Sequence, residues 1–171
     1  VAVSYYDGQG FMVPASLGVK SVKELDGATV CVQTGTTTEK TTADYFHSHG
    51  MKYKTVVFDT TEATQSAFIS GRCDVYTTDM SDLAGVRMIA PDPSKFVILP
   101  ETISKEPLGP AVRRGDWEWF EIVRWSFMAF LGAEELGVTQ ANVDDMRKNS
   151  RDPNVMRLVG AGEDMGRMLG L

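Results

Sequence analysis

Short β-type runs alternate with helical patterns along the first hundred residues of the chain. The β-type runs occupy residues 30–33, 54–58, 74–77 and 96–99, and the segments between them (38–48, 61–70 and 81–86) place apolar residues at helical spacing. Two further extended segments, 1–7 and 11–13, precede them and are separated by a break at 8–10. This alternation predicts an α/β fold, an open and mostly parallel sheet with helices on both faces.

The pattern changes after residue 112. Residues 116–136 predict one long helix that is rich in Trp and Phe, and two short helices are expected at 142–148 and 153–159. The long helix carries a wide apolar surface, and the short polar helices after it offer little to cover that surface. The sequence therefore predicts helices at the C-terminal end that need another partner surface.

Residues 28–39, ATVCVQTGTTTE, combine a strand, a glycine turn and the start of a helix. Gly35 provides the turn, and Thr36 has Glu39 three residues later, which is the spacing of a capping box. Free N–H groups, hydroxyls and the helix dipole at such a start favour a carboxylate or a phosphate. An ordinary helix cap explains the same residues, so both interpretations stay open on this segment alone.

A second strand ends in Thr77, Thr78 and Asp79. In a doubly wound sheet, ligands bind outside the carboxyl ends of the strands. One strand end would supply anion donors and the other a carboxylate, which together suit a free amino acid. The competing interpretation of Asp79 is a cap for the helix that follows.

Charge and composition exclude several classes of function. The formal net charge is −6 with no long basic run, which argues against nucleic acid as a partner. No apolar segment approaches the roughly 20 residues that span a membrane. No CxxC motif is present, and His47 and His49 are spaced by two residues, so neither a metal site nor a cofactor is expected.

The chain has two cysteines: Cys31 lies in the predicted strand 30–33, and Cys73 lies at the start of the predicted strand 74–77. If the two strands are neighbours, the thiols come within reach of disulfide geometry. We predict this disulfide; the alternative is a pair of buried free thiols, which is common in reducing compartments.

Three segments resemble the periplasmic amino-acid-binding proteins of ABC transporters, most closely the general L-amino-acid-binding type. They are CVQTGTTTE at 31–39, GRCDVYTTDMSDL at 71–83 and ISKEPLGPAVRRGDWEWFEIVRWSFMAFLGAEELGVT at 103–139. The resemblance covers nearly the whole chain. It implies a solute-binding protein in the periplasm with the type II periplasmic-binding fold, an L-amino acid as ligand, a membrane permease as partner, and no catalysis.

The resemblance also implies a division of the chain. Residues 1–14 match a first hinge strand region, 15–104 the second ligand-binding lobe, 105–112 a second hinge, and 113–171 the helical remainder of the first lobe. In proteins of this family, two lobes close around the ligand.

The same resemblance assigns the ligand contacts. Thr37, through its backbone N–H, matches the contact to the ligand carboxylate, with Thr36 assisting. Gly35 and Gln33 belong to the same motif. Asp79 matches the residue that holds the α-amino group.

Family members carry a further first-lobe segment with an arginine that grips the ligand carboxylate. This chain is therefore expected to be a truncated form with an incomplete site, and Arg113 and Arg114 are weak substitutes for that arginine. The uncovered aromatic helix leads us to expect a homodimer.

Two other functions remain open for the same fold, and a purely structural fragment without activity is a third alternative. A dehydratase of cyclic acids would need a general acid or base, for which Glu39 and His47 are the nearby candidates. A sensory receptor module would need a signalling partner domain.

Overall fold

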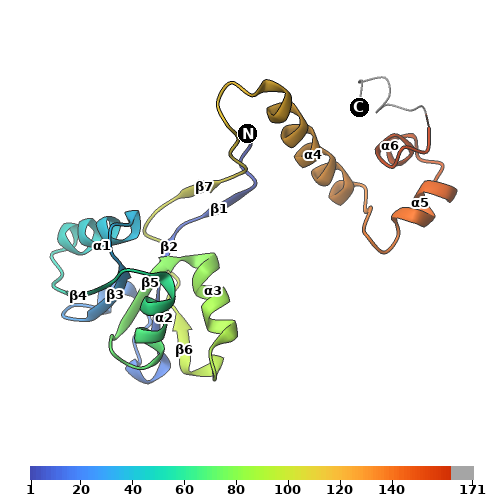
Figure 1. Cartoon of the computed structure of the whole chain (residues 1–171). Coiled ribbons are helices and arrows are strands. Elements are labelled where there is room, and N and C mark those ends of the chain that lie inside the picture. The colour runs from blue at the N-terminus through green and yellow to red at the C-terminus, as the bar shows by residue number, and fades with distance from the viewer. Residues whose placement is uncertain (163–171) are drawn as a thin grey trace. The chain divides into compact units, whose positions relative to one another are not determined.

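The computed structural model describes residues 1–162, and these divide into two compact units (Figure 1). The sheet unit is Ser4–Leu108. The helical unit comprises Val1–Val3 and the chain from Gly109 onward. Of the expected helical segment 113–171, residues 163–171 lie outside the described part.

The sheet unit contains a five-stranded sheet with the order β4-β3-β5-β2-β6. Its strands are β2 (Gln9–Pro14), β3 (Thr29–Gln33), β4 (Lys54–Phe58), β5 (Val75–Asp79) and β6 (Phe96–Ile98). Strand β3 pairs in parallel with β4 and β5, whereas β2 pairs antiparallel with both β5 and β6. Four of the five strands therefore point the same way, and the predicted mostly parallel sheet is confirmed.

Helices cover both faces of this sheet, as predicted (Figure 1). Alternation along the strands divides the core in two, since neighbouring side chains of a strand point to opposite faces. Phe11 and Val13 of β2 pack with Phe46 of α1 (Thr37–Ser48) on one face. Met12, between them, belongs to the cluster on the other face, which is covered by α2 (Thr61–Ile69) and α3 (Met80–Ile89). Short 3-10 turns lie at Ala15–Leu17, Val22–Glu24 and Pro93–Lys95.

The break expected at residues 8–10 is wrong for Gln9 and Gly10. Both belong to β2, which is inserted between β5 and β6. Only Gly8 separates β2 from β1 (Tyr5–Asp7), which pairs antiparallel with β7 (Glu106–Leu108) in a separate two-stranded sheet (Figure 1). Local glycines suggested a turn, but pairing with strands more than 60 residues away determines the conformation.

Gly8 is a position where a side chain has no room. A Cβ placed there would collide with the backbone oxygen of Ser104 and with the methyl group of Thr102. Ser104 has little freedom to move, because its hydroxyl accepts a hydrogen bond from the N–H of Gln9 over 2.7 Å. Gly8→Ala is therefore expected to lower the free energy of unfolding by about 1–3 kcal/mol in urea denaturation.

Gly85, inside α3, is the matched control. A Cβ there meets nothing within 4 Å, and alanine is the better helix former. Gly85→Ala should raise the stability by roughly 0.5–1 kcal/mol. Equal effects of the two substitutions would contradict the steric argument for Gly8.

The predicted disulfide between Cys31 and Cys73 is present, with a Cα–Cα distance of 5.7 Å. Cys31 lies in β3, whereas Cys73 lies two residues before β5 begins. Both side chains are buried in the core cluster under α2 and α3. The bond therefore joins a strand of the sheet to the segment that leads into its neighbour.

The helical unit contains α4 (Trp117–Glu135), α5 (Val143–Asn149) and α6 (Pro153–Leu158). No residue of α4 is buried within the described part of the chain. Trp117, Trp119, Trp125 and Phe130 are all more than half exposed. This agrees with the uncovered apolar surface expected from the sequence, and the homodimer inferred from that surface stays a prediction.

Candidate functional site

Helix α1 begins directly after strand β3, at a turn built by Gly35 in a left-handed conformation (φ 71°). Thr36 caps the helix: its hydroxyl accepts from the N–H of Glu39 over 3.3 Å and donates to the carbonyl of Gln33 over 2.8 Å. The carboxylate of Glu39 accepts from the N–H of Gly35 over 2.8 Å. The predicted capping box thus forms with its return bond shifted by one residue. Thr37 follows at the first helical position, where backbone N–H groups have no partner inside the helix.

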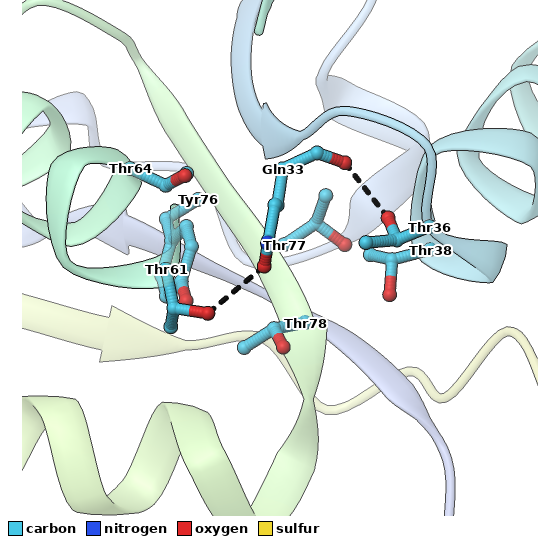
Figure 2. Close-up of a pocket in the computed structure, with 8 residues that line it drawn as sticks. All are labelled: Gln33, Thr36, Thr38, Thr61, Thr64, Tyr76, Thr77 and Thr78. Carbon is cyan, nitrogen blue, oxygen red and sulfur yellow. Dashed lines mark hydrogen bonds between the residues drawn. The ribbon is translucent and has the colours of Figure 1, made fainter. Parts of the chain in front are cut away.

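A polar pocket opens beside this helix start, as Figure 2 shows. Eight residues from β3, β5 and the first turns of two helices line it: Gln33, Thr36, Thr38, Thr61, Thr64, Tyr76, Thr77 and Thr78. Two of the predicted site residues, Gln33 and Thr36, are among them. Gly35, Thr37 and Asp79 lie next to lining residues in the chain but are not part of the lining.

A buried glutamine fastens α1 to the sheet. The Nε2 of Gln9 lies 2.8 Å from the hydroxyl oxygens of Thr42 and Thr77 and 3.1 Å from the carbonyl oxygen of Thr38, and its two hydrogens are shared among these three acceptors. Gln9 is only 1% exposed, and its Oε1 has no hydrogen-bond partner within residues 1–162. This network fixes the helix start relative to β2 and β5. Sequence reasoning missed it, because Gln9 stood between two glycines in an expected break.

Asp7, at the end of β1, occupies the start of α3. Its carboxylate accepts from the N–H of Gly8 over 2.8 Å and from the hydroxyl of Ser81. Desolvation, the largest single effect, raises the pKa of Asp7, but the hydrogen bonds from Ser81, Gly8 and the Met80 backbone outweigh it and hold the pKa below its ordinary value. Asp7 is therefore a charged acceptor at a helix N-terminus, where negative charge is favoured.

Asp79, the last residue of β5, also precedes α3, yet its side chain makes no capping hydrogen bond. Burial raises the pKa of Asp79 first, and the negative charges of Glu106 and Asp7 and a hydrogen bond with Glu106 raise it further. Within residues 1–162, Asp79 takes part in no salt bridge. A cation that approaches the Asp79 carboxylate would stabilise its ionised form. The capping interpretation of Asp79 is wrong, because Asp7 takes that role.

The two strand ends lie at one edge of the sheet. Cys31 of β3 pairs in parallel with Tyr76 of β5, so both strands reach that edge within a few residues. Thr36 and Thr78 line the same pocket, and Thr78 is the neighbour of Asp79 in β5. The fold thus brings the anion-favouring start of α1 and the carboxyl-bearing end of β5 together, as expected for the carboxyl ends of neighbouring parallel strands.

The residues considered for acid–base chemistry do not meet. Glu39 lies in the first turn of α1 and is engaged with Gly35, whereas His47 is in the last turn, roughly 12 Å along the helix axis. Arg113 and Arg114, which were considered as weak substitutes for the arginine that grips the ligand carboxylate in the family, belong to the helical unit. Among residues 1–162, no group of three His, Cys, Asp or Glu side chains is arranged to hold a metal ion. No helix in this range is both long and apolar enough to cross a membrane.

Known proteins with similar sequences bind amino acids, according to their names. The chain is 55% identical over 171 residues to the glutamate/glutamine/aspartate/asparagine-binding protein BztA of Rhodobacter capsulatus, covering 100% of this chain and 51% of that protein. It is 54% identical over 171 residues to the general L-amino acid-binding periplasmic protein AapJ of Rhizobium johnstonii, covering 99% of this chain and 50% of that protein. The chain thus spans about half the length of the curated relatives it matches.

A solved structure shows the same fold. An ABC transporter periplasmic binding protein from Brucella ovis, with glutathione bound, superimposes with a TM-score of 0.90 at 51% identity, covering 99% of this chain and 54% of that one. The family model described as NMT1/THI5 like matches residues 5–102, more than half of the chain. The chain therefore belongs to the NMT1/THI5-like family and has the periplasmic-binding-protein fold that its sequence motifs predicted.

Proposed function

We propose that this chain supplies one wall of the amino-acid site in a solute-binding protein of an ABC transporter. The ligand's α-carboxylate binds at the start of α1, and its α-ammonium binds Asp79. The observation that carries the proposal is the pairing of opposite preferences at one sheet edge. The start of α1, where the first N–H groups have no partner inside the helix, lies at the end of β3, and a carboxylate that forms no salt bridge within residues 1–162 lies at the end of the neighbouring β5.

The carboxylate end rests on the first turn of α1. The N–H of Thr37 has no hydrogen-bond partner inside the helix or elsewhere in residues 1–162, so it can donate to a ligand, and the hydroxyl of Thr36 is held in place by its bond to the carbonyl of Gln33. The helix dipole favours negative charge at this position. Gly35 keeps the approach open, because no side chain stands over the turn.

The ammonium end rests on Asp79. Glu106 lies against the Asp79 carboxyl, so the two groups repel each other when both are ionised. An ammonium between or beside them relieves this repulsion and forms a charge-assisted hydrogen bond. The α-amino group of a ligand provides this cation.

The names of the relatives support the wider assignment. BztA and AapJ are named as binding proteins, which favours binding over the dehydratase alternative. We propose the same setting for this chain: it acts in the periplasm, delivers its ligand to a membrane permease and does not catalyse a reaction. Residues 1–14 and 105–112 are proposed to act as hinges, 15–104 as one lobe and 113–171 as part of the other. A protein of the relatives' length would supply the opposite wall, so this chain alone is expected to bind weakly.

Thr37→Pro tests the carboxylate contact in a protein of the relatives' length that contains this chain. Proline removes the N–H at the first helical position, where it is well tolerated, and Thr36 already has the extended backbone that precedes a proline (φ −97°, ψ 160°). Amino-acid affinity by calorimetry should fall by roughly 1.5–3 kcal/mol, the worth of a hydrogen bond to a charged group. The thermal midpoint should stay within a few degrees.

Thr37→Val is the matched control. It removes the hydroxyl but keeps the N–H, so affinity should be close to that of the unmodified protein. Retained affinity in Thr37→Pro would place the carboxylate elsewhere, and a loss in Thr37→Val as large as in Thr37→Pro would assign the contact to the hydroxyl.

A further inference from the structure

Gln9 is a polar residue at a position of β2 where the other side chains on the same face are apolar. Alternate residues of a strand point to the same face, so Gln9 shares its face with Phe11 and Val13, which belong to the core cluster that includes Phe46 of α1. Gln9 is as deeply buried as these neighbours. For packing alone, an apolar residue of similar length would serve at this position.

The carboxamide of Gln9 is only partly satisfied. Three acceptors surround its Nε2, whereas its buried Oε1 has no hydrogen-bond partner within residues 1–162. A buried polar group that is satisfied on one side only is less favourable than an apolar group in the same place. The bonds of Gln9 are therefore better explained by what they hold in place than by a gain in stability.

The elements that Gln9 joins carry the two proposed ligand contacts. Its Nε2 lies against the carbonyl of Thr38, the residue after Thr37, and against the hydroxyl of Thr42 one turn further along α1. In the antiparallel register of β2 and β5, Gln9 is paired with Asp79. A single side chain thus connects the start of α1 to the strand position directly opposite Asp79.

The backbone of Gln9 is held on its other side. Its N–H donates to the hydroxyl of Ser104 over 2.7 Å, and its carbonyl accepts from the N–H of Ile103 over 2.8 Å. Strand β2 is in addition enclosed between β5 and β6. The start of α1 is therefore fastened to a point of the sheet that is itself fixed.

We propose that Gln9 is a positioning residue that sets the distance between the carboxylate contact at Thr37 and the ammonium contact at Asp79. The inference rests on the proposed amino-acid site. An α-amino acid has a fixed spacing between these two groups, because both are bonded to the same carbon. Simultaneous binding of both groups is therefore sensitive to a shift of α1 relative to β5, whereas binding of either group alone is not.

Glycine and its two halves test this role in the 171-residue chain, labelled with ¹⁵N. Acetate carries only the carboxylate, methylammonium only the ammonium, and glycine both. Acetate should shift the amide signal of Thr37 and methylammonium that of Asp79. Glycine should shift both signals at concentrations roughly tenfold or more below those needed for either half. Absence of these shifts, or glycine no better than its halves, would remove the proposed function and the role of Gln9 with it.

Gln9→Met keeps the length of the side chain and removes its hydrogen bonds. The former partners stay satisfied, because the hydroxyl of Thr42 donates to the carbonyl of Thr38 and the hydroxyl of Thr77 to that of Gly10, each over 2.7 Å. The glycine concentration needed should rise roughly tenfold, whereas those of acetate and methylammonium should stay within about twofold. The thermal midpoint should change little.

Thr42→Val is a milder second variant, and Thr41→Val is its matched control. Thr42→Val removes one acceptor of Gln9. Thr41 makes the same kind of bond to the carbonyl four residues earlier, over 2.9 Å, but none to Gln9. The advantage of glycine over its halves should shrink in Thr42→Val, by less than in Gln9→Met, and stay unchanged in Thr41→Val.

Two results would overturn the positioning role while the proposed function stands. The first is an unchanged advantage of glycine over its halves in folded Gln9→Met, which would show that Gln9 does not set the spacing. The second is a loss of acetate or methylammonium binding as large as the loss of glycine binding, which would make Gln9 part of a contact. If Gln9→Met does not fold, the same comparison in Thr42→Val decides.

Discussion

Reduction of the Cys31–Cys73 disulfide is expected to lower the free energy of unfolding by about 4 kcal/mol. The bond closes a loop across 42 positions of sequence, and its absence returns that loop's entropy to the unfolded chain. The net stability of a folded protein is about 5–15 kcal/mol, so a loss of about 4 kcal/mol would be a large share of it. Urea unfolding of the chain with and without a reductant measures the difference.

The variant Cys31→Ala with Cys73→Ala provides the control. A reductant should leave its unfolding curve unchanged. Its stability should lie below that of the reduced unmodified chain, because both side chains are buried and their loss opens a cavity. Two reactive thiols in the denatured, unreduced protein, or equal stability before and after reduction, would disprove the expectation.

Local patterns in the sequence were enough to predict most of the sheet unit. Strand β3 and helix α1 were recognisable because a β-type run, a glycine turn and a threonine cap follow each other within a dozen residues. The expected order of strands and helices followed from periodicity alone. That order predicted a mostly parallel sheet, which the structure confirms.

Long-range pairing could not be predicted in this way. Strand β2 lies between β5 and β6, whose residues follow it by more than 60 positions, and its glycine-flanked start looked like a turn. Asp7 caps α3 although 74 positions separate it from Ser81. No periodicity in a sequence reports such contacts, because they depend on which strands become neighbours.

The candidate site was predictable in part. Gln33 and Thr36 were identified from the strand end and cap, and both line the pocket. Thr61 and Thr64 were recognised only as the start of α2. The rule that ligands bind at the carboxyl ends of strands would have included them, because α2 begins just after β4. The Gln9 network needed the three-dimensional structure.

Asp79→Asn is expected to weaken amino-acid binding by at least about 2 kcal/mol, or roughly thirtyfold, in a protein of the relatives' length that contains this chain. The substitution keeps the shape of the side chain but removes the charge that the ligand's ammonium needs. Stability should not fall, because the change also removes the repulsion between Asp79 and Glu106. Calorimetry of binding, alongside thermal unfolding of the free protein, separates the two effects.

The pH dependence of the amino-acid affinity tests this role of Asp79 most directly. Burial and the neighbouring carboxylates raise the pKa of Asp79, so protonation begins at a higher pH than for an ordinary aspartate. A protonated Asp79 carries no charge for the ammonium, so affinity should fall as pH decreases through that raised pKa, and Asp79→Asn should lack this component. Asp44→Asn makes the same charge change at an exposed position of α1 and should retain both the affinity and the pH dependence. An identical pH profile in Asp79→Asn would assign the ammonium to another group, because no other observation would then connect Asp79 to the ligand.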